Sequence, residues 1–149
     1  MEAIYDAKLD PEFQNAFIDI DKQDSRKLPD GTEIPFRYIH GGFEGTAVRF
    51  SFFYPEKEQY EGRFYQYLSP FPGPDEEIAS ISLTGGDDKI AFALTHGAYF
   101  VETNMGSAAI FTNSNDNTMT HRSSAAAAEY YRKKAQEVYG YEHRPYGYV

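Results

Sequence analysis

Hydrophobic and polar residues alternate in three aromatic-rich segments of the first half of the chain. They cover residues 36–40, 48–54 and 63–68, and Gly or Pro follows each of them closely. Alternation between such residues is typical of strands with one face buried. Because only residues 56–62 separate the second segment from the third, we expect these two to be antiparallel neighbours.

The pattern changes to helical spacing after residue 87. The apolar positions at this spacing are Ile90, Ala93 and Leu94. Asp87 or Asp88 can accept hydrogen bonds from the first free amides, and Gly97 is typical of a helix end. The apolar run 98–103 predicts a strand directly after this helix.

The clearest helix covers residues 125–139, opened by Ser123 or Ser124 and ended by Gly140. One face carries Ala127, Tyr131, Ala135 and Val138, at i, i+4, i+8 and i+11. Residues 104–120, rich in Asn, Ser, Thr and Gly, predict a long loop before it, and residues 145–149 predict the start of a last strand.

Together these elements predict an α/β fold with a mixed sheet. The first strands are expected to be antiparallel, and the strand–helix–strand order of the second half predicts parallel βαβ crossovers. Residues 1–34 show no sustained periodicity of apolar positions, so we expect them to form a loosely packed leader. A domain over residues 35–149 is expected to follow it.

Composition narrows the classes of partner. The 149 residues carry a formal net charge of −9, which disfavours nucleic acid and anionic membrane surfaces. No apolar run approaches the roughly 20 residues that span a bilayer. The acidic N-terminus is unlike a signal peptide, which leaves the location unknown and the cytoplasm as the default expectation. There is no Cys, which removes disulfides and thiol nucleophiles.

The segment His40-Gly41-Gly42-Phe43 is similar to the glycine-rich oxyanion loop of lipases. That loop follows a strand and precedes a helix, whereas this segment precedes a predicted strand. We therefore interpret it as a turn that joins two strands.

The sequence contains no recognised motif for a metal site, a cofactor site or a nucleophile. The four histidines are His40, His96, His121 and His143, and no pair has the i, i+4 spacing of a helical zinc site. We expect no metal and no cofactor, and we interpret His96 as a favourable cation at a helix end. No serine lies in a Gly-x-Ser-x-Gly elbow, and the acidic run 75–77 is expected to be a solvated patch.

Five segments in order resemble the amino-terminal part of bacterial α/β-hydrolase-domain proteins of the tannase and feruloyl-esterase-like branch. They are residues 38–46, 49–55, 60–64, 97–104 and 143–148. This resemblance implies an incomplete α/β-hydrolase fold, in which the Tyr146-Gly147-Tyr148 strand leads into the turn that presents the nucleophilic serine. It also implies that the chain ends before the nucleophile, the acid and the histidine.

One catalytic element of that family could lie within the chain. If residues 63–68 are the third strand of the family's fold, the loop that supplies an oxyanion amide is 69–73. Pro70 and Pro72 have no N–H, so the resemblance points to Phe71 as the backbone donor. The alternative is a rigid proline turn with a packed Phe.

Two hypotheses for function follow. The first is the N-terminal segment of a serine hydrolase acting on ester or related acyl bonds, inactive alone, whose partner is the remaining hydrolase segment or a second copy at an open sheet edge. The second is a non-catalytic, aromatic-rich binding module for glycan or phenolic ligands, using Tyr139, Tyr141, Tyr146 and Tyr148.

Overall fold

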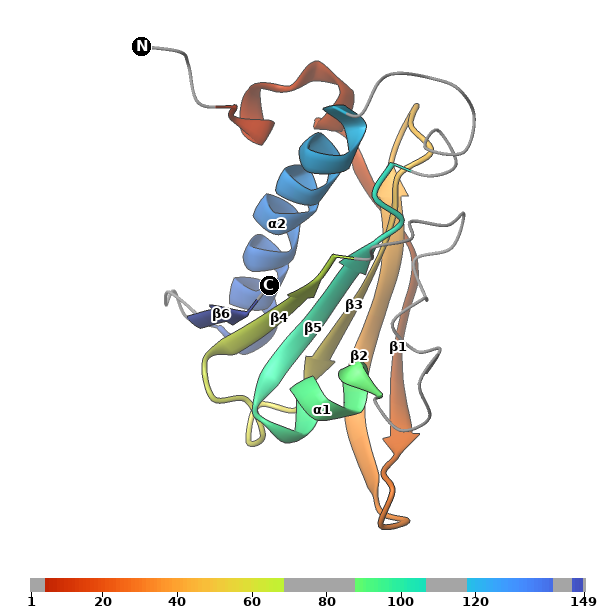
Figure 1. The fold of residues 1–149 in the computed structure, drawn as a ribbon, viewed down its shortest axis with the longest axis vertical. Helices are drawn as coiled ribbons and strands as arrows, with labels where there is room; N and C mark the ends of the chain where they lie inside the picture. Colours follow the sequence, from red (N-terminus) through yellow and green to blue (C-terminus); the bar gives the residue numbers. More distant parts are fainter. Residues whose placement is uncertain (1–4, 69–87, 107–117, 141–145, 149) are drawn as a thin grey trace.

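In the described part of the chain, a six-stranded mixed sheet has the α-helix α1 on one face and α2 on the other (Figure 1). The computed structural model describes residues 5–68, 88–106, 118–140 and 146–148. The strands are β1 (Ala16–Lys27), β2 (Glu33–Phe43), β3 (Arg49–Pro55), β4 (Arg63–Tyr67), β5 (Ala98–Thr103) and β6 (Tyr146–Tyr148). The helices are the short 3-10 turns η1 (Ala7–Leu9) and η2 (Pro11–Phe13), then α1 (Lys89–Thr95) and α2 (Thr118–Tyr139).

The strand order is β1-β2-β3-β5-β4-β6. The pairs β1–β2, β2–β3 and β3–β5 are antiparallel, whereas β4 is parallel to both β5 and β6. The prediction of a mixed sheet with a parallel second half is therefore confirmed. The expected pairing of 48–54 with 63–68 is wrong, because β5 lies between β3 and β4 and pairs with both.

The first 34 residues contribute η1, η2, β1 and the start of β2. β1 pairs with β2 along its length, so the expected boundary at residue 34 falls within a strand of the sheet. Phe13 is buried and joins the core beneath α2. The division into a leader and a domain stays a prediction.

The segment 40–43 is not a turn, so that interpretation is wrong. It forms the end of β2 and pairs with β1 on one side and β3 on the other. A Cβ at Gly41 would lie 1.9 Å from the carbonyl oxygen of Phe17, so glycine permits the close approach of β1. The chain turns later, where Gly45 has a φ of 76°.

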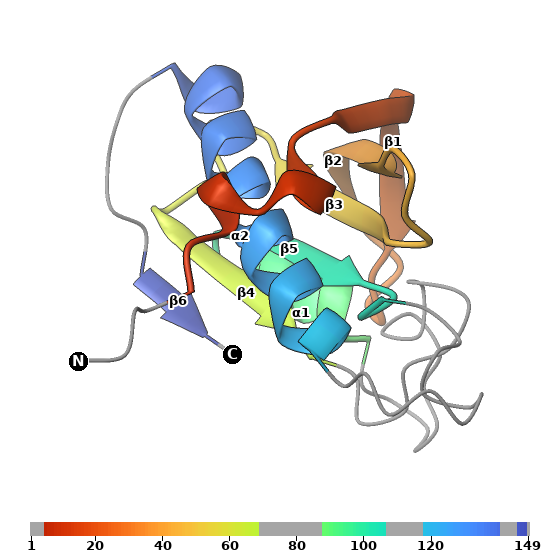
Figure 2. The same cartoon turned by 90° about the horizontal axis from the view of Figure 1, so that it is seen from above.

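The helices α1 and α2 lie on opposite faces of the sheet (Figure 2), and each packs on its own hydrophobic core. α2 covers a large aromatic cluster that includes Phe50, Phe52, Tyr54, Tyr99 and Tyr131. α1 covers a smaller cluster that includes Phe36, Phe53 and Phe100.

Both helices occupy the predicted regions. α1 begins after Asp88, whose side chain accepts hydrogen bonds from the amides of Ile90 and Ala91, and ends before Gly97, with a φ of 69°. α2 begins about two turns earlier than the prediction. Ser123 and Ser124 lie inside it and donate their hydroxyls to the carbonyl of Thr120 instead of capping it. Within the described residues no helix has the length and apolar character needed to cross a membrane.

Candidate functional site

The carboxyl ends of the parallel strands β4, β5 and β6 lie at one edge of the sheet. In open α/β sheets, ligands bind outside the carboxyl ends of the strands. The functional site is therefore sought at this edge, and the residues that end β4 and β5 are the first to consider.

A row of polar residues crosses the sheet near this edge. It lies on the same face of the sheet as α1, which packs nearer the amino end of β5. His40 of β2 pairs with Ser51 of β3, Ser51 with Glu102 of β5, and Glu102 with Tyr67 of β4. Side chains of directly paired residues share one face. We call His40, Ser51, Glu102 and Tyr67, together with Asp19, the polar row.

Asp19 enters the polar row through an irregularity of β1. The register of β1 against β2 shifts between Ile18 and Ile20, so Asp19 is an extra residue opposite His40. Such a bulge redirects a side chain. Asp19 Oδ1 lies 2.5 Å from His40 Nδ1. Burial works to raise the pKa of Asp19, but the hydrogen bond and charge of His40 outweigh it and lower that pKa.

The Asp19 carboxylate can only accept, so His40 Nδ1 carries the proton of this bond. In the neutral imidazole Nε2 is then the acceptor, which is the tautomer of a general base. The His40 side chain is 16% exposed. The pair therefore has the chemistry of a histidine oriented by a carboxylate.

Ser51 stands next to this histidine but lacks the properties of a nucleophile. It is 0% exposed, and its Oγ lies 3.1 Å from the hydroxyl of Tyr38. A nucleophile must contact the substrate, which a fully buried hydroxyl cannot do. We interpret Ser51 as a structural member of the polar row, and Glu102, 2% exposed, as a second buried member.

The chain turns sharply at the end of β5. Met105 has a φ of 51° and Gly106 a φ of 91°. Positive φ at a residue other than glycine is uncommon and is found more often at functional sites. Asn104 holds the turn: its Oδ1 accepts from the amide of Arg49 and its Nδ2 donates to the carbonyl of Ala47.

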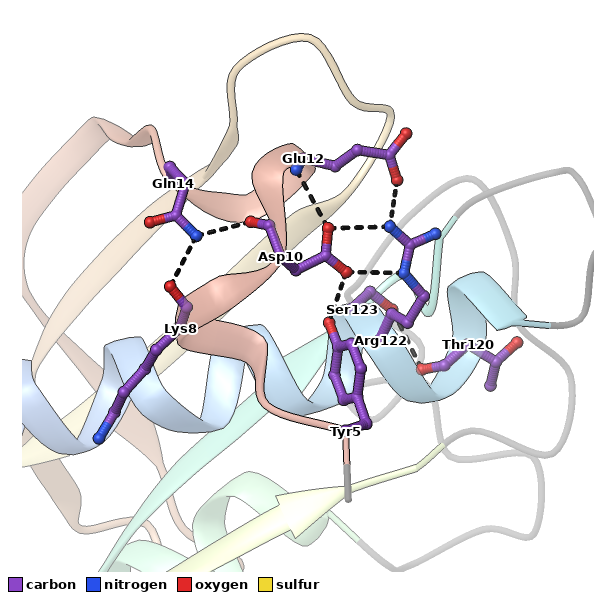
Figure 3. A network of polar contacts seen from close by, with 8 residues as sticks. All are labelled: Tyr5, Lys8, Asp10, Glu12, Gln14, Thr120, Arg122 and Ser123. Atoms are coloured by element: carbon purple, nitrogen blue, oxygen red, sulfur yellow. Dashed lines mark hydrogen bonds and ion pairs between the residues drawn. The ribbon is translucent and has the colours of Figure 1, made fainter. Parts of the chain in front are cut away.

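A second polar network fixes the start of α2 near the same edge (Figure 3). Both Asp10 oxygens accept from the Arg122 guanidinium, at 2.8 and 2.9 Å. Arg122 also bonds Glu12, and Asp10 accepts from the hydroxyl of Tyr5. The hydrogen bond from Arg122 holds the pKa of Asp10 far below its ordinary range, and burial with this carboxylate raises the pKa of Tyr5 to about 12.

The predictions for individual site residues were confirmed, contradicted or left untested by the structure. Phe71, Asp87, His143, Tyr141 and the acidic run 75–77 lie outside the described residues. His96 is the C-cap of α1, where its backbone N–H donates into the last turn, and its interpretation as a cation stays a prediction. The rings of His121 and Tyr5 form a T-shaped contact with centroids 5.5 Å apart. Tyr139 is 1% exposed and donates its hydroxyl to the carbonyl of Pro55, so its assignment to an exposed stacking surface is wrong.

Within the described ranges no group of three His, Asp or Glu side chains is arranged to hold a metal ion. The polar row and the Asp10–Arg122 pair were missed by sequence reasoning. Asp19 and His40 are 21 residues apart, and Asp10 and Arg122 are 112 apart. The strand alternation could have placed His40 and Tyr38 on one face, but no local signal marks the bulge that brings Asp19 to them.

Comparison with known proteins gives a structural likeness. No family model matches the chain, and no curated protein matches it. The structure of tannin acyl hydrolase from Aspergillus niger is similar, with a TM-score of 0.53 and 13% sequence identity. The match covers 93% of this chain and 29% of that structure, so this chain spans less than a third of its length. At this identity the likeness shows a shared fold.

Proposed function

We propose that this chain is the amino-terminal segment of a hydrolase that acts on ester or related acyl bonds. The observation that supports the proposal is the fold shared with a tannin acyl hydrolase over 93% of this chain. The arrangement of β5, β4 and β6 agrees with it, because three parallel strands bring their carboxyl ends to one edge, where catalytic groups of such sheets lie.

In this proposal the nucleophilic serine lies in the turn after β6, in residues beyond Val149. β6 is parallel to β4, so its carboxyl end points to the same edge as the polar row. The segment by itself contributes the sheet, α1, α2 and the proposed backbone amide of Phe71, which follows β4 in the sequence. Without nucleophile, acid and histidine, the isolated segment is expected to be inactive.

The coding sequence downstream of codon 149 tests the position of the nucleophile. We expect a Gly-x-Ser-x-Gly elbow within a few residues of β6, followed by an acid and a histidine. A continuing frame without such an elbow would contradict the proposal.

An activity assay tests the assignment of roles. The isolated chain is expected to hydrolyse a nitrophenyl ester no faster than buffer alone does. If the chain hydrolyses the ester and Ser51→Ala or His40→Gln abolishes this, the nucleophile lies in the polar row and the proposal is overturned. Arg132→Gln, an exposed substitution on α2, is the matched control.

The proposed partner is the remaining part of the hydrolase or a second copy, bound at the edge of the sheet. Within the described residues β6 pairs with β4 alone. An unpaired strand edge readily pairs with another chain. We expect the isolated chain to self-associate with rising concentration in light scattering; a monomer at all concentrations would contradict this partner assignment.

A further inference from the structure

A wide groove lies between α1 and the tip of the β1–β2 hairpin. Its volume is about 910 Å³, within the range of pockets that hold small ligands. One wall is the hairpin tip with Leu28 and Pro29, the other is the α1 face with Ala91 and Phe92, and Tyr65 of β4 also lines it. These five side chains are apolar or aromatic, so the surface that they form suits an apolar part of a ligand.

Phe92 gives the groove a flat aromatic surface. Its side chain is 56% exposed, although the neighbouring Ile90, Ala93 and Leu94 are buried. The ring of His96 stacks on it with centroids 4.2 Å apart. An exposed ring supported in this way presents a face to a ligand ring, and offset stacking is favourable beyond the area it buries.

Two lysines line the groove without an ion-pair partner among the described residues, Lys27 and Lys89. Lys89 Nζ lies 5.4 Å from the centre of the Tyr67 ring. The carboxylate of Asp88, which also lines the groove, is 2.7 Å from the guanidinium of Arg26 and caps α1, so its charge is compensated.

Asp30 is a remaining negative charge at the groove. It lies at the hairpin tip, where its Oδ1 accepts from the amide and the hydroxyl of Thr32. The hydrogen bonds from Thr32 lower its pKa, so it stays ionised. Among the described lining residues the two lysines outweigh Asp30, since Arg26 compensates Asp88, and this part of the groove favours an anion.

We propose that this groove binds a small aromatic carboxylate, with the ring against Phe92 and the carboxylate near Lys89 and Lys27. The groove is defined by its own lining residues, so this inference does not rest on the proposed hydrolase function. An aliphatic acid would lack the stacking, and a neutral aromatic amide would lack the ionic contact.

The direct test is a ligand titration followed by NMR of the labelled full chain. Benzoate is expected to bind with a Kd on the order of 1 mM, as a ligand of so few atoms allows. It should shift the amides of Phe92 and Lys89 in a saturable way. Cyclohexanecarboxylate and benzamide are expected to bind at least about threefold more weakly.

Substitutions in the groove separate the two contributions. Phe92→Ala is expected to weaken benzoate binding about tenfold, the upper value for a lost aromatic pair. Lys89→Gln and Lys27→Gln should each weaken it about two- to fivefold, less at high salt. Asp30→Asn keeps an acceptor for Thr32 but removes the charge, so it should tighten binding about twofold.

Matched controls lie elsewhere on the surface. Leu9→Ala removes an apolar side chain that is 80% exposed, and Lys57→Gln removes an exposed cation; neither should change benzoate affinity. The proposal is overturned if benzoate does not saturate or shifts residues away from the groove. Equal affinity for benzamide or for cyclohexanecarboxylate, or Phe92→Ala binding as tightly as Leu9→Ala, would also overturn it.

Discussion

The two faces of the sheet differ in the described helix that covers each of them and in the chemistry of the side chains beneath it. On one face the 22-residue helix α2 covers aromatic side chains, and hydroxyls such as those of Tyr54 and Tyr139 donate to main-chain carbonyls. On the other face the 7-residue helix α1 packs on the rows nearer the amino end of β5, and the polar row crosses the sheet nearer its carboxyl end.

This difference separates stability from function. Aromatic burial on the α2 face stabilises the fold, since each buried ring removes a large apolar area from water. The α1 face keeps ionisable side chains near the carboxyl edge and an exposed ring in its groove. Substitutions on the first face should therefore change stability most, and those on the second should change binding or local structure.

The largest effect is expected at Phe52, which is 0% exposed and stacks on Phe50 with centroids 4.4 Å apart. Phe52→Ala should lower the free energy of unfolding by about 3–5 kcal/mol through the lost burial and the cavity it leaves. Denaturant unfolding measures this. Phe92→Ala, from the exposed ring of the α1 face, is the matched control and should change it by less than about 0.5 kcal/mol. Similar losses for both would contradict the contrast between the faces.

Asp10 should give the next largest effect, because it ties the start of the chain to α2. Its side chain is 4% exposed and that of Arg122 is 21% exposed. Asp10→Ala leaves Arg122 with Glu12 alone, so we expect a loss of about 2–3 kcal/mol, below the value for fully buried pairs. Glu12→Ala, whose carboxylate is half exposed, should cost less than about 1 kcal/mol.

The same pair predicts a dependence on pH. The folded-state pKa of Asp10 is lowered below the ordinary value of 3.8, mainly by the hydrogen bond from Arg122. Its contribution is therefore complete above that ordinary value and is lost as the pH falls from there toward the folded-state pKa. Acid unfolding should begin below about pH 4. Asp10→Asn should flatten this part of the stability curve; an unchanged slope would show that other carboxylates cause it.

Much of the fold follows from local sequence, but its pairing does not. Alternation at 36–40 and 48–54 predicts β2 and β3, and Asp88 with Gly97 predicts α1, because caps and periods are local properties. The position of β5 between β3 and β4 depends on contacts between residues far apart in the sequence. The short linker 56–62 suggested instead that β3 and β4 are neighbours. Gly41 shows the same limit, because its close contact is with Phe17 of another strand.

The candidate site is even less visible in the sequence. His40 has an ordinary strand position, and only the bulge at Asp19 makes it part of a carboxylate–histidine pair. Bulges have no strong sequence signal apart from glycine. The tyrosines show the converse: aromatic composition suggested a binding surface at Tyr139, but the fold buries that ring.

A smaller effect is expected in the polar row at Ser51. Ser51→Ala removes the hydroxyl that shares a hydrogen bond with Tyr38 and leaves the backbone pairing of β3 intact. A lost hydrogen bond of this type costs about 1 kcal/mol. Denaturant unfolding should show this loss, and Ser25→Ala, which removes an exposed hydrogen bond to Glu33, should change stability by less than about 0.5 kcal/mol. A loss as large as that of Phe52→Ala would mean that the polar row contributes to folding as strongly as the aromatic core.

The smallest effect is expected at Tyr99, in the centre of the α2 face. It is 0% exposed, and no described residue forms a hydrogen bond with its hydroxyl, although burial among Tyr54, Tyr60 and Tyr131 raises its pKa. Burying a hydroxyl without a partner costs free energy. Tyr99→Phe keeps the ring contacts and removes that cost, so it should leave stability unchanged or raise it by up to about 1 kcal/mol.

Tyr54→Phe is the matched comparison for Tyr99→Phe, because Tyr54 is also buried and its ring contacts Tyr99, with centroids 5.2 Å apart. Its hydroxyl donates to the carbonyl of Tyr131 at 2.8 Å, so the substitution should lower stability by about 1 kcal/mol. Thermal unfolding of the two variants measures the difference in sign. If Tyr99→Phe is the more damaging of the two, its hydroxyl has a bonding role that the described residues do not supply, and the α2 face is then more than a packing surface.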